Sequence, residues 1–593
     1  MEGLYVYMTS NSIFVALTKN EKFWDKSKDV ILLGDWCLSD FEKKHEYKVL
    51  PYPIKLEDSS YSRFDQYNQE LYSKYLKIFT RLLNKEHKVN HCVRYWDIVL
   101  GSFLYRYIGV MYERYLTIQS LLEQHDKFDC FIADTTKSKA VIVDELSFMR
   151  LIQDDDYNFE LYSKVLSFFN IEGKKIKINR ERDDVHFHKP VNYIRKIIEF
   201  IFWLIAHLKG GKKLIFMKNS YLDIKFIAKL AIFSKYRVKI KLYESYESYE
   251  SDCEYDIEMR KRFQGCLSGG DQFELFLKTV LPFDLPMSVV ENYKYLNELA
   301  KKQYPKKDPD IIFSANSWYY DELFKVWAAG LLGKSKLLGI QHGGNYGVSR
   351  YLLEEKYEAR ITDFYLTWGW KKYKYNNIIP FGPTKMINYK KEKTKSDDIL
   401  FVMTSKPEYF CDLRFIPSER VSYFENQKIF LDNISNNLLD KFRIRPYPSE
   451  DQNRHINLWN SYNKQVKVDG KNEKFLDSLN NCKLYVSDHL MTTYLESLKM
   501  NIPTIIFLDK KYPNGLISKS MAGDFQKLED VGILYFSAKS AALAINRLGN
   551  NIDKWWFAPK VQNVRGEFCD KFAKNLNNPI SDFDNLFAKV SCK

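Results

Sequence analysis

The sequence has no Cys-x-x-Cys pair, and its nine cysteines are scattered and odd in number. This pattern argues against a disulfide framework or a structural zinc site and is typical of a protein in a reducing cytosol. The N-terminal stretch MEGLYVYMTSNSIF lacks the basic start and long apolar core of a secretory signal. No run reaches the roughly 18 apolar residues that cross a bilayer. We therefore expect a cytoplasmic protein that is soluble or peripheral to a membrane.

Signals for nucleic acids and for metals are also missing. There is no Arg-Gly tract and no zinc-finger spacing, so DNA and RNA are not expected as partners. No Asp-x-Asp motif sits at the end of a polar strand, and the run 154–156 is expected in an acidic turn. No metal and no cofactor other than a bound substrate are therefore predicted. The net charge of +14 suits an anionic partner such as a nucleotide, a phospholipid surface or an acidic glycan.

Apolar strands alternate with helical patterns along the chain. With 593 residues and 45% hydrophobic content, the chain is long enough for two or more cores. Such alternation predicts parallel, doubly wound sheets. A stretch rich in Lys, Asn and Pro at 371–398 has little periodicity and is expected to link two domains. We predict an N-terminal domain at 1–390, with a helical insertion around 154–310, and a C-terminal domain at 397–593.

Three polar residues in the first part of the chain are candidate catalytic groups. Asp35 follows the strand-like DVILLG, and Asp134 ends a buried strand expected within 128–136. His91 lies in a helical pattern that runs from 61 to 124. For each of the three, a structural role within the fold is the alternative.

An apolar run of roughly a dozen residues occupies 197–208. It is flanked by Arg195, Lys196, Lys209, Lys212 and Lys213. It is too short to span a bilayer. Its aromatic residues, Phe200, Phe202 and Trp203, could dock on an anionic membrane face. A buried core helix is the alternative, and the sequence favours it.

The apolar run Leu337–Ile340 stops at Gln341-His342-Gly343-Gly344. This is typical of a buried parallel strand that ends in a loop whose backbone comes close to a ligand. In open α/β sheets ligands lie beyond the carboxyl ends of the strands, so His342 is placed to act on one. The alternative is a hydrogen-bonded structural histidine beside a glycine turn.

Two strand-to-loop junctions near the C-terminus predict a phosphate site. After a strand that ends at Val486, a helix is expected to begin near Thr492 and Thr493, where free N–H groups suit an anion. Glu496, one turn further, could bind a ribose. In RIRPYP, Arg443 and Arg445 share one face of a strand, and guanidinium groups recognise phosphate. The alternatives are helix capping by Ser487 and Asp488 and a solvated arginine face.

The blocks QHGGNYG, DFYLTWGW, NHCVRYWDIVLGSFL and WYYDELFKVWAA resemble a family of transferases associated with O-antigen and surface-carbohydrate loci. The resemblance covers most of the chain and is weakest across 154–310. The RPYP and SD…TT…E blocks are also similar, more loosely, to capsule ketosugar transferases, bacterial sialyltransferases and polyol-phosphate transferases. The resemblance implies an α/β, GT-B-like fold, with two Rossmann-like doubly wound domains facing across a cleft.

The resemblance also implies roles for these residues. His342 would deprotonate the acceptor hydroxyl, because a neutral imidazole with a pKa of about 6.5 suits a base at cellular pH. Arg445 stands where many relatives have a histidine before the proline, and it would contact the donor phosphate. The other expected donor ligands are Arg443, Ser487, Thr492, Thr493, Glu496, Gln341, Gly343 and Gly344. Asp35 and His91 are further candidates for the base.

The function expected from this resemblance is a metal-independent, inverting glycosyltransferase. It would move a sugar, a CMP-linked acidic ketosugar first, from a nucleotide donor to a growing bacterial surface polysaccharide such as O-antigen, lipopolysaccharide or capsule. The acceptor would be a glycan or a lipid-linked glycan at the cytoplasmic face of the inner membrane. The alternatives are a CDP-polyol phosphotransferase of a teichoic-acid-like polymer, a nucleotide-sugar epimerase, and an inactive scaffold in an assembly complex.

Overall fold

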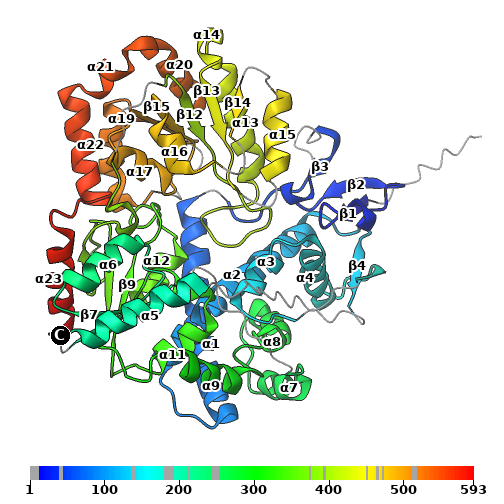
Figure 1. Cartoon of the computed structure of the whole chain (residues 1–593). Helices are drawn as coiled ribbons and strands as arrows, with labels where there is room; N and C mark the ends of the chain where they lie inside the picture. The colour runs from blue at the N-terminus through cyan, green and yellow to red at the C-terminus, as the bar shows by residue number, and fades with distance from the viewer. Residues whose placement is uncertain are drawn as a thin grey trace, which may run out of the picture.

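The structure is a computed structural model. It describes residues 13–38, 45–55, 57–135, 141–178, 193–210, 213–242, 253–372, 375–390, 396–448, 452–462, 466–469, 473–509 and 517–592. Figure 1 shows that these residues form an N-terminal part with long helices and two sheet-containing parts, one above the other. Lys212, one of the predicted basic flanks of the apolar run, lies outside the described ranges.

The N-terminal part is built around two long helices. Their bounds are α1 (Asp58–His87) and α2 (Val93–Gln124), followed by the shorter α3 (Glu145–Leu151) and α4 (Asp155–Phe168). Helix α2 is buried on most of its circumference, because α1, α4 and later helices pack around it. The strands of this N-terminal part are β1 (Ile13–Ala16), β2 (Asp29–Leu32) and β3 (Lys48–Val49) in one small parallel sheet, and the parallel pair β4 (Phe131–Asp134) and β5 (Lys174–Lys177).

The first large sheet has six parallel strands in the order β11-β10-β9-β8-β6-β7. Their bounds are β6 (Leu214–Lys218), β7 (Arg237–Lys241), β8 (Ile311–Ser314), β9 (Lys336–Ile340), β10 (Phe364–Thr367) and β11 (Ile378–Pro380). Helix α5 (Tyr193–Leu208) precedes the first of these strands, and the helices between them are α6 (Ile224–Phe233), α7 (Ile257–Gly265), α8 (Gln272–Asp284), α9 (Tyr293–Gln303), α10 (Ser317–Tyr320), α11 (Glu322–Ala329) and α12 (Leu353–Ile361). Both neighbours of β9, the strand that precedes His342, are parallel to it, so its end lies at the common carboxyl edge of the sheet.

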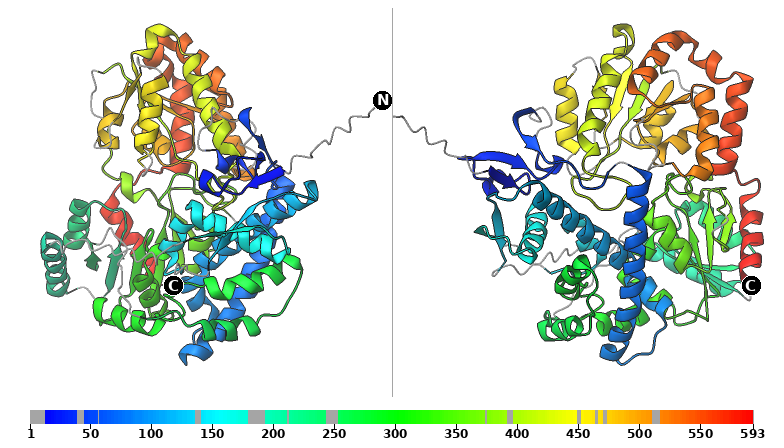
Figure 2. Two further views of the ribbon diagram at one scale, coloured as in Figure 1. Left: turned by 90° about the vertical axis from the view of Figure 1, so that its right-hand side faces the viewer. Right: turned by 180° about the vertical axis from the view of Figure 1, so that it is seen from behind.

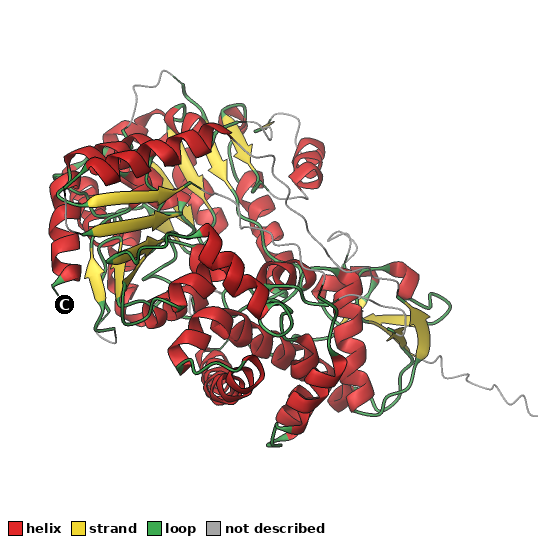
Figure 3. Cartoon of the chain, turned by 60° about the horizontal axis from the view of Figure 1, so that its bottom comes forward, coloured by secondary structure: helices red, strands yellow, loops and turns green. Residues whose placement is uncertain are grey.

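Alternation along each strand divides the side chains of this sheet between two cores. In β6, Phe216 packs with the core around α2 and α11, whereas Ile215 and Met217 pack with the core under α6. Helices therefore cover both faces, as Figure 3 shows, and the sheet is doubly wound.

The second large sheet repeats this design, with the parallel order β14-β13-β12-β15-β16-β17. Its strands are β12 (Ile399–Val402), β13 (Phe442–Arg445), β14 (Lys467–Val468), β15 (Leu484–Ser487), β16 (Thr504–Phe507) and β17 (Leu534–Tyr535). Its helices are α13 (Glu419–Asp432), α14 (Asn436–Leu439), α15 (Gln452–Tyr462), α16 (Phe475–Asn480), α17 (Thr493–Lys499), α19 (Ala522–Asp530), α20 (Ala538–Leu548), α21 (Ile552–Trp556), α22 (Pro559–Phe572) and α23 (Pro579–Ser591). The predicted α/β class, with two Rossmann-like halves in a GT-B-like arrangement, is confirmed.

Two segments tie the halves together. Helix α23 leaves the second half and packs on the first sheet, where Phe583 and Phe587 join the core under α6. Figure 2 shows this last helix, in red, beside the lower part. In the other direction, the segment 403–418 leaves β12 and reaches the N-terminal helices, where Tyr409 packs on Trp36.

The domain pattern differs from the prediction in two respects. The strands predicted near the start of the chain form the separate small sheet β1–β2–β3 and not part of a six-stranded sheet. The range 154–310 contains helices α4 to α9, but it also supplies β5, β6 and β7, so two strands of the first large sheet lie within it.

The alternative that the sequence favoured for the run 197–208, a buried core helix, is wrong. Only Phe202 and Ala206 of α5 are buried, because the helix packs over the edge strand β7 on one side and none of the described residues covers its other side. Among the described residues no helix is long and apolar enough to cross a membrane.

Candidate active site

His342 is the second residue after β9, at the carboxyl edge of the first large sheet. Its side chain is 22% exposed, and its Nδ1 lies 3.3 Å from Oε1 of Glu358. Glu358 comes from α12, which follows the glycine loop and packs against β9 and β10. The glycine loop and α12 therefore fold back on the strand end and place a buried carboxylate against the imidazole.

The carboxylate of Glu358 is completely buried and satisfied by protein donors. The hydroxyl of Tyr365 donates to Oε2 at 2.6 Å, and the hydroxyl of Tyr346 donates to Oε1 at 3.2 Å. Burial raises the pKa of Glu358. Burial alone would lower the pKa of His342, but the charge of Glu358 raises it above the ordinary value. The hydroxyl of Tyr346 also lies 3.2 Å from Nδ1 and 3.3 Å from Nε2 of His342. A carboxylate at Nδ1 orients the imidazole ring, which is the arrangement of a general base and its positioning partner.

Gln341 has a structural role that explains why the QHGG and WGW motifs occur together. Its side-chain oxygen accepts hydrogen bonds from the backbone N–H of Trp368 (2.9 Å) and the indole of Trp370 (2.7 Å). Its amide donates to the carbonyl of Gly343 at 2.7 Å. The amide of Gln341 thus holds the His342 loop against the neighbouring loop, and the expected contact of Gln341 with the donor stays a prediction.

The glycine loop touches the second half of the protein directly. The N–H of Gly344 donates to Oγ1 of Thr492 at 3.2 Å. A Cβ on Gly344 would stand 2.4 Å from the carbonyl oxygen of Met491, so only glycine allows this approach. A Cβ on Gly343 would meet Oδ1 of Asn345 at 3.0 Å. The structure thus brings together the two predicted motif regions, QHGG and SD…TT…E. The residues that touch are Gly344 and Thr492, and their contact packs one domain against the other.

The other predicted ligands between 487 and 496 have hydrogen-bond or ion-pair partners within the protein. Thr493 accepts a hydrogen bond from the hydroxyl of Tyr485 (2.7 Å), and Ser487 donates to the carbonyl of His489 (2.8 Å). Glu496 is buried and pairs with Lys385 at 2.8 Å. The geometry gives these side chains local partners in place of the expected donor phosphate and ribose.

The predicted arginine pair shares one face of β13, as expected, but both guanidinium groups meet a carboxylate. Asp469 is buried and lies 2.9 Å from Arg445 and 3.3 Å from Arg443. Arg445 also donates to the hydroxyl of Ser478 (3.1 Å) and to the carbonyl of Glu473 (2.7 Å). Arg445 is therefore held in an ion pair inside the domain, and its expected contact with the donor phosphate stays a prediction.

The two remaining catalytic candidates lie away from His342. Asp35 begins a short 3-10 helix that follows β2 of the small sheet, and His91 lies in the connection between α1 and α2. The His91 ring stacks on Tyr95 at 3.6 Å and its Nε2 lies 2.9 Å from the hydroxyl of Tyr293, and burial lowers its pKa. These are the contacts of a packed structural histidine.

The predicted acidic turn at 154–156 is a helix start: Asp154 caps α4 by accepting the N–H of Tyr157 at 2.8 Å. Asp134, the last residue of β4, pairs with Lys177 of β5 in the parallel ladder. Among the residues that the structure describes, no three His, Cys, Asp or Glu side chains group so that they could hold a metal ion.

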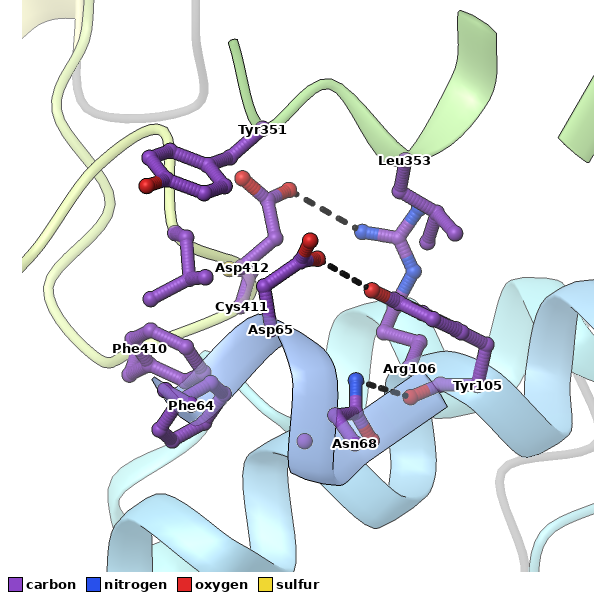
Figure 4. A pocket seen from close by; sticks show the side chains of 12 residues that line it. Phe64, Asp65, Asn68, Tyr105, Arg106, Tyr351, Leu353, Phe410, Cys411 and Asp412 are labelled. Carbon is purple, nitrogen blue, oxygen red and sulfur yellow. Dashed lines mark hydrogen bonds and ion pairs between the residues drawn. The ribbon is translucent and has the colours of Figure 1, made fainter. Parts of the chain in front are cut away.

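The sequence analysis did not predict a cluster of charged side chains that the segment 403–418 places near the loop of His342. Arg414 pairs with Glu354 at 2.9 Å, and Arg106 of α2 lies 3.3 Å from the same carboxylate and 3.4 Å from Asp412. Figure 4 shows Arg106 and Asp412 meeting across this junction, around a cavity of about 20 Å³ that has room for a water molecule only. The nearby positive charge of Arg414 lowers the pKa of His342, but by less than the charge of Glu358 raises it. No sequence motif marks these residues.

Burial alone would raise the pKa of Asp412, but Arg414 and Arg106 lower it to about 2. The junction between the N-terminal helices and the second half is therefore a buried network of ion pairs. It positions Arg414, from the second half, near the candidate base of the first half.

His489 was also missed. It follows β15 in the loop that meets Gly344, and it is 8% exposed. Its Nδ1 accepts the N–H of Met491 at 3.1 Å, which leaves the proton on Nε2, and that nitrogen has no hydrogen-bond partner among the described residues. Burial, with a smaller effect of Lys406, lowers its pKa to about 3. A neutral imidazole with a free N–H at the carboxyl edge of a parallel sheet is suited to donate to a ligand.

A family described as LIC12162 family transferase has a model that matches residues 13–587. No curated protein matches the sequence. Three solved structures are distantly similar. MurG from Acinetobacter baumannii is 11% identical over 64% of this chain and all of its own, with a TM-score of 0.30. The UDP-GlcNAc 2-epimerase of Methanocaldococcus jannaschii is 9% identical over 60% of this chain and 97% of its own (TM-score 0.33). An alpha,alpha-trehalose-phosphate synthase (UDP-forming) from Burkholderia xenovorans is 11% identical over 64% of this chain and all of its own (TM-score 0.33).

Proposed function

The chain belongs to the LIC12162 family of transferases, and we propose that the group it transfers is a sugar carried by a nucleotide. The observation that carries this proposal is the pair formed by His342 and Glu358, with a 3.3 Å contact at the carboxyl edge of a doubly wound sheet. It supplies a partly exposed base at the place where ligands bind in such folds.

In the proposed reaction His342 Nε2 takes the proton of an acceptor hydroxyl. The acceptor oxygen attacks the anomeric carbon of the sugar, the bond from that carbon to the nucleotide phosphate breaks, and the nucleotide leaves as an anion. Attack on the side opposite the phosphate inverts the anomeric centre. Glu358 stabilises the imidazolium that forms, because its charge lies against Nδ1.

The donor side of this proposal rests on His489. Its buried Nε2–H has no described hydrogen-bond partner, whereas Arg445 pairs with Asp469, and Arg414 pairs with Asp412 at 2.7 Å and with Glu354 at 2.9 Å. An N–H without a protein acceptor suits the negative charge that develops on a leaving phosphate.

We further propose a CMP-linked acidic ketosugar as the donor and a bacterial surface polysaccharide, O-antigen or lipid-linked glycan as the acceptor. The support is the excess of basic residues in a chain of net charge +14, together with the sequence resemblance to transferases of surface-carbohydrate loci. The reaction would need no metal, since N–H donors of the protein would meet the charge of the leaving phosphate.

A thermal-shift panel tests the donor. Purified protein is heated with CMP, CDP, UDP, GDP or dTDP, and with no nucleotide. A ligand that binds only the folded state raises the melting temperature by mass action. We expect CMP to produce the largest rise; a rise with CDP alone would favour the polyol-phosphate alternative. If no nucleotide raises the melting temperature at millimolar concentration, the proposed donor site is wrong.

Two variants locate the site, and each is compared with its own nucleotide-free melting temperature. His489→Ala is expected to reduce the nucleotide-dependent rise. Arg445→Ala, the matched control, is expected to lower the basal melting temperature but to keep the rise. The reverse result would restore Arg445 as the phosphate ligand and remove His489 from that role.

A further inference from the structure

Helix α5 carries an apolar surface that nothing in the described structure covers. Phe200 is 59% exposed and Trp203 41% exposed, and other large side chains on the helix are exposed as well. They are Tyr193, Ile194, Ile197, Ile201, Leu204 and Leu208. A contiguous exposed surface of this kind on a globular protein marks an interaction site.

Helix α6 extends this surface. It contacts α5, and it exposes Ile224, Ile232 and Phe233, the last of them 70% exposed. Figure 1 shows α5 and α6 in front of the first large sheet, and Figure 2 shows them at the outer edge of the molecule. We call the exposed apolar residues of these two helices the α5–α6 face.

The charge around this face is strongly basic. Residues 193–242 include 12 Lys or Arg and only two Asp or Glu. Lys196 of α5 and Lys225, Lys229 and Lys235 in and after α6 are exposed. A second copy of the chain would bring the same excess of positive charge against itself, whereas an anionic lipid surface would neutralise it.

The size of the surface fits a helix that lies in the plane of a membrane. Helix α5 has 16 residues and is about 24 Å long. It is amphipathic, with one side on the protein and with aromatic and aliphatic side chains on the other. Such helices bury their apolar side in the boundary between headgroups and acyl chains, and neighbouring lysines bind anionic headgroups.

The α5–α6 face begins next to the candidate base. Tyr221, in the loop between β6 and α6, stacks on the ring of His342, with centroids 6.2 Å apart and planes 7° apart. Its φ of 56° is in the left-handed region, so the loop holds this residue in an uncommon conformation. Helix α6 starts at Ile224, which is itself exposed.

We propose that the α5–α6 face docks the protein on an anionic bilayer and holds His342 beside an acceptor that is anchored in that bilayer. The docking stands on the exposed face and its charge alone. The anchored acceptor rests on the proposed function.

Vesicle flotation tests the docking. Purified protein is mixed with vesicles of phosphatidylcholine alone or of phosphatidylcholine with phosphatidylglycerol. We expect flotation with the anionic vesicles, weakening as salt is added, and little with the neutral ones. Phe200→Ser with Trp203→Ser is expected to reduce the floating share about tenfold, and Lys196→Glu with Lys229→Glu by a similar factor.

Phe557→Ser is the matched control, because it removes another exposed aromatic, 52% exposed, from the second half of the protein. It should float as the unmodified protein does, and the melting temperature of every variant shows that it is folded. Absence of flotation with anionic vesicles, or unchanged flotation of the α5 variant, overturns the docking. A concentration-dependent dimer that the α5 variant dissociates, without flotation, would identify a second copy as the occupant instead.

The same variants separate this inference from the proposed function. Phe200→Ser with Trp203→Ser should keep the nucleotide-dependent rise in melting temperature, since these residues lie outside the candidate active site. If the protein floats but no nucleotide stabilises it, the docking stands and the proposed function falls. If a nucleotide stabilises it but it does not float, the function stands and the membrane surface is wrong.

Discussion

Replacement of Glu358 by Gln should shift the titration of His342 to lower pH. The substitution keeps the shape of the side chain but removes the negative charge that lies 3.3 Å from Nδ1. Glu358 raises the pKa of His342 against burial, so burial dominates once the charge is gone, and the pKa falls. Tyr365 and Tyr346, which donate to the carboxylate, can still donate to the amide oxygen.

The effect on catalysis follows from the same contact. A hydrogen bond to a charged group contributes about 1 to 1.5 kcal/mol more than a neutral one, which corresponds to a rate loss of about tenfold in Glu358→Gln. His342→Ala removes the base itself and should cost about 10²- to 10⁴-fold. Because the base form of His342 must be neutral, the rate of the unmodified protein should rise as the pH rises through the raised pKa. In Glu358→Gln this rise should occur at lower pH.

The titration can be measured without a substrate. The chain has ten histidines, and carbon-13 labelling of their rings resolves each by nuclear magnetic resonance, with His342→Ala identifying the signal of interest. Glu322→Gln is the control, because it removes another buried carboxylate, one paired with Lys325 at 3.0 Å. An unchanged His342 titration in Glu358→Gln, or the same shift in the control, would refute the reasoning.

Three further predictions concern contacts that hold the site in place. Gly344→Ala should lower the melting temperature, because its Cβ would stand 2.4 Å from a backbone oxygen of the second half; a melting temperature equal to the unmodified protein would show that the loops are not in contact. Trp370→Phe should lower the free energy of unfolding by about 1 to 3 kcal/mol in urea denaturation, because the hydrogen bond from its indole N–H to buried Gln341 is lost. Trp555→Phe is its comparison, because it loses an indole hydrogen bond of 3.0 Å to the carbonyl of Val531. Arg445→Ala should cost about 3 kcal/mol, because buried Asp469 loses its closest cation; a neutral result would mean that the pair is not formed in solution.

Much of the fold could be predicted from local pattern. The short apolar runs before Gln341 and before the turn at 403 are buried parallel strands, since burial on both faces of a sheet leaves no polar positions in the strand. The QHGG and WGW motifs were also visible as motifs. The contact between the two motifs could not be predicted, because the hydrogen bonds that Gln341 accepts from Trp368 and Trp370 join the ends of neighbouring strands that are far apart in sequence.

The candidate site was predictable only in part. His342 at a strand end and the glycine at 344 could be found, because each requires a particular residue at a particular point of the backbone. Glu358 and Arg414 could not be found, since no local pattern relates a helix residue or a loop arginine to a distant histidine. The ion pair of Arg445 could not be found for the same reason: the sequence does not show that Asp469 lies beside it.

The sequence by itself determined the alternation of strand and helix, the strand ends, the excess of basic charge and the apolar character of 193–208. These properties are local, because they depend on the order and spacing of side chains along the chain. Only the tertiary structure decided which carboxylate meets which cation and which side of α5 is left uncovered. Both depend on segments that are far apart in sequence and become neighbours on folding, and the chemistry of a buried ionisable group is set by those neighbours.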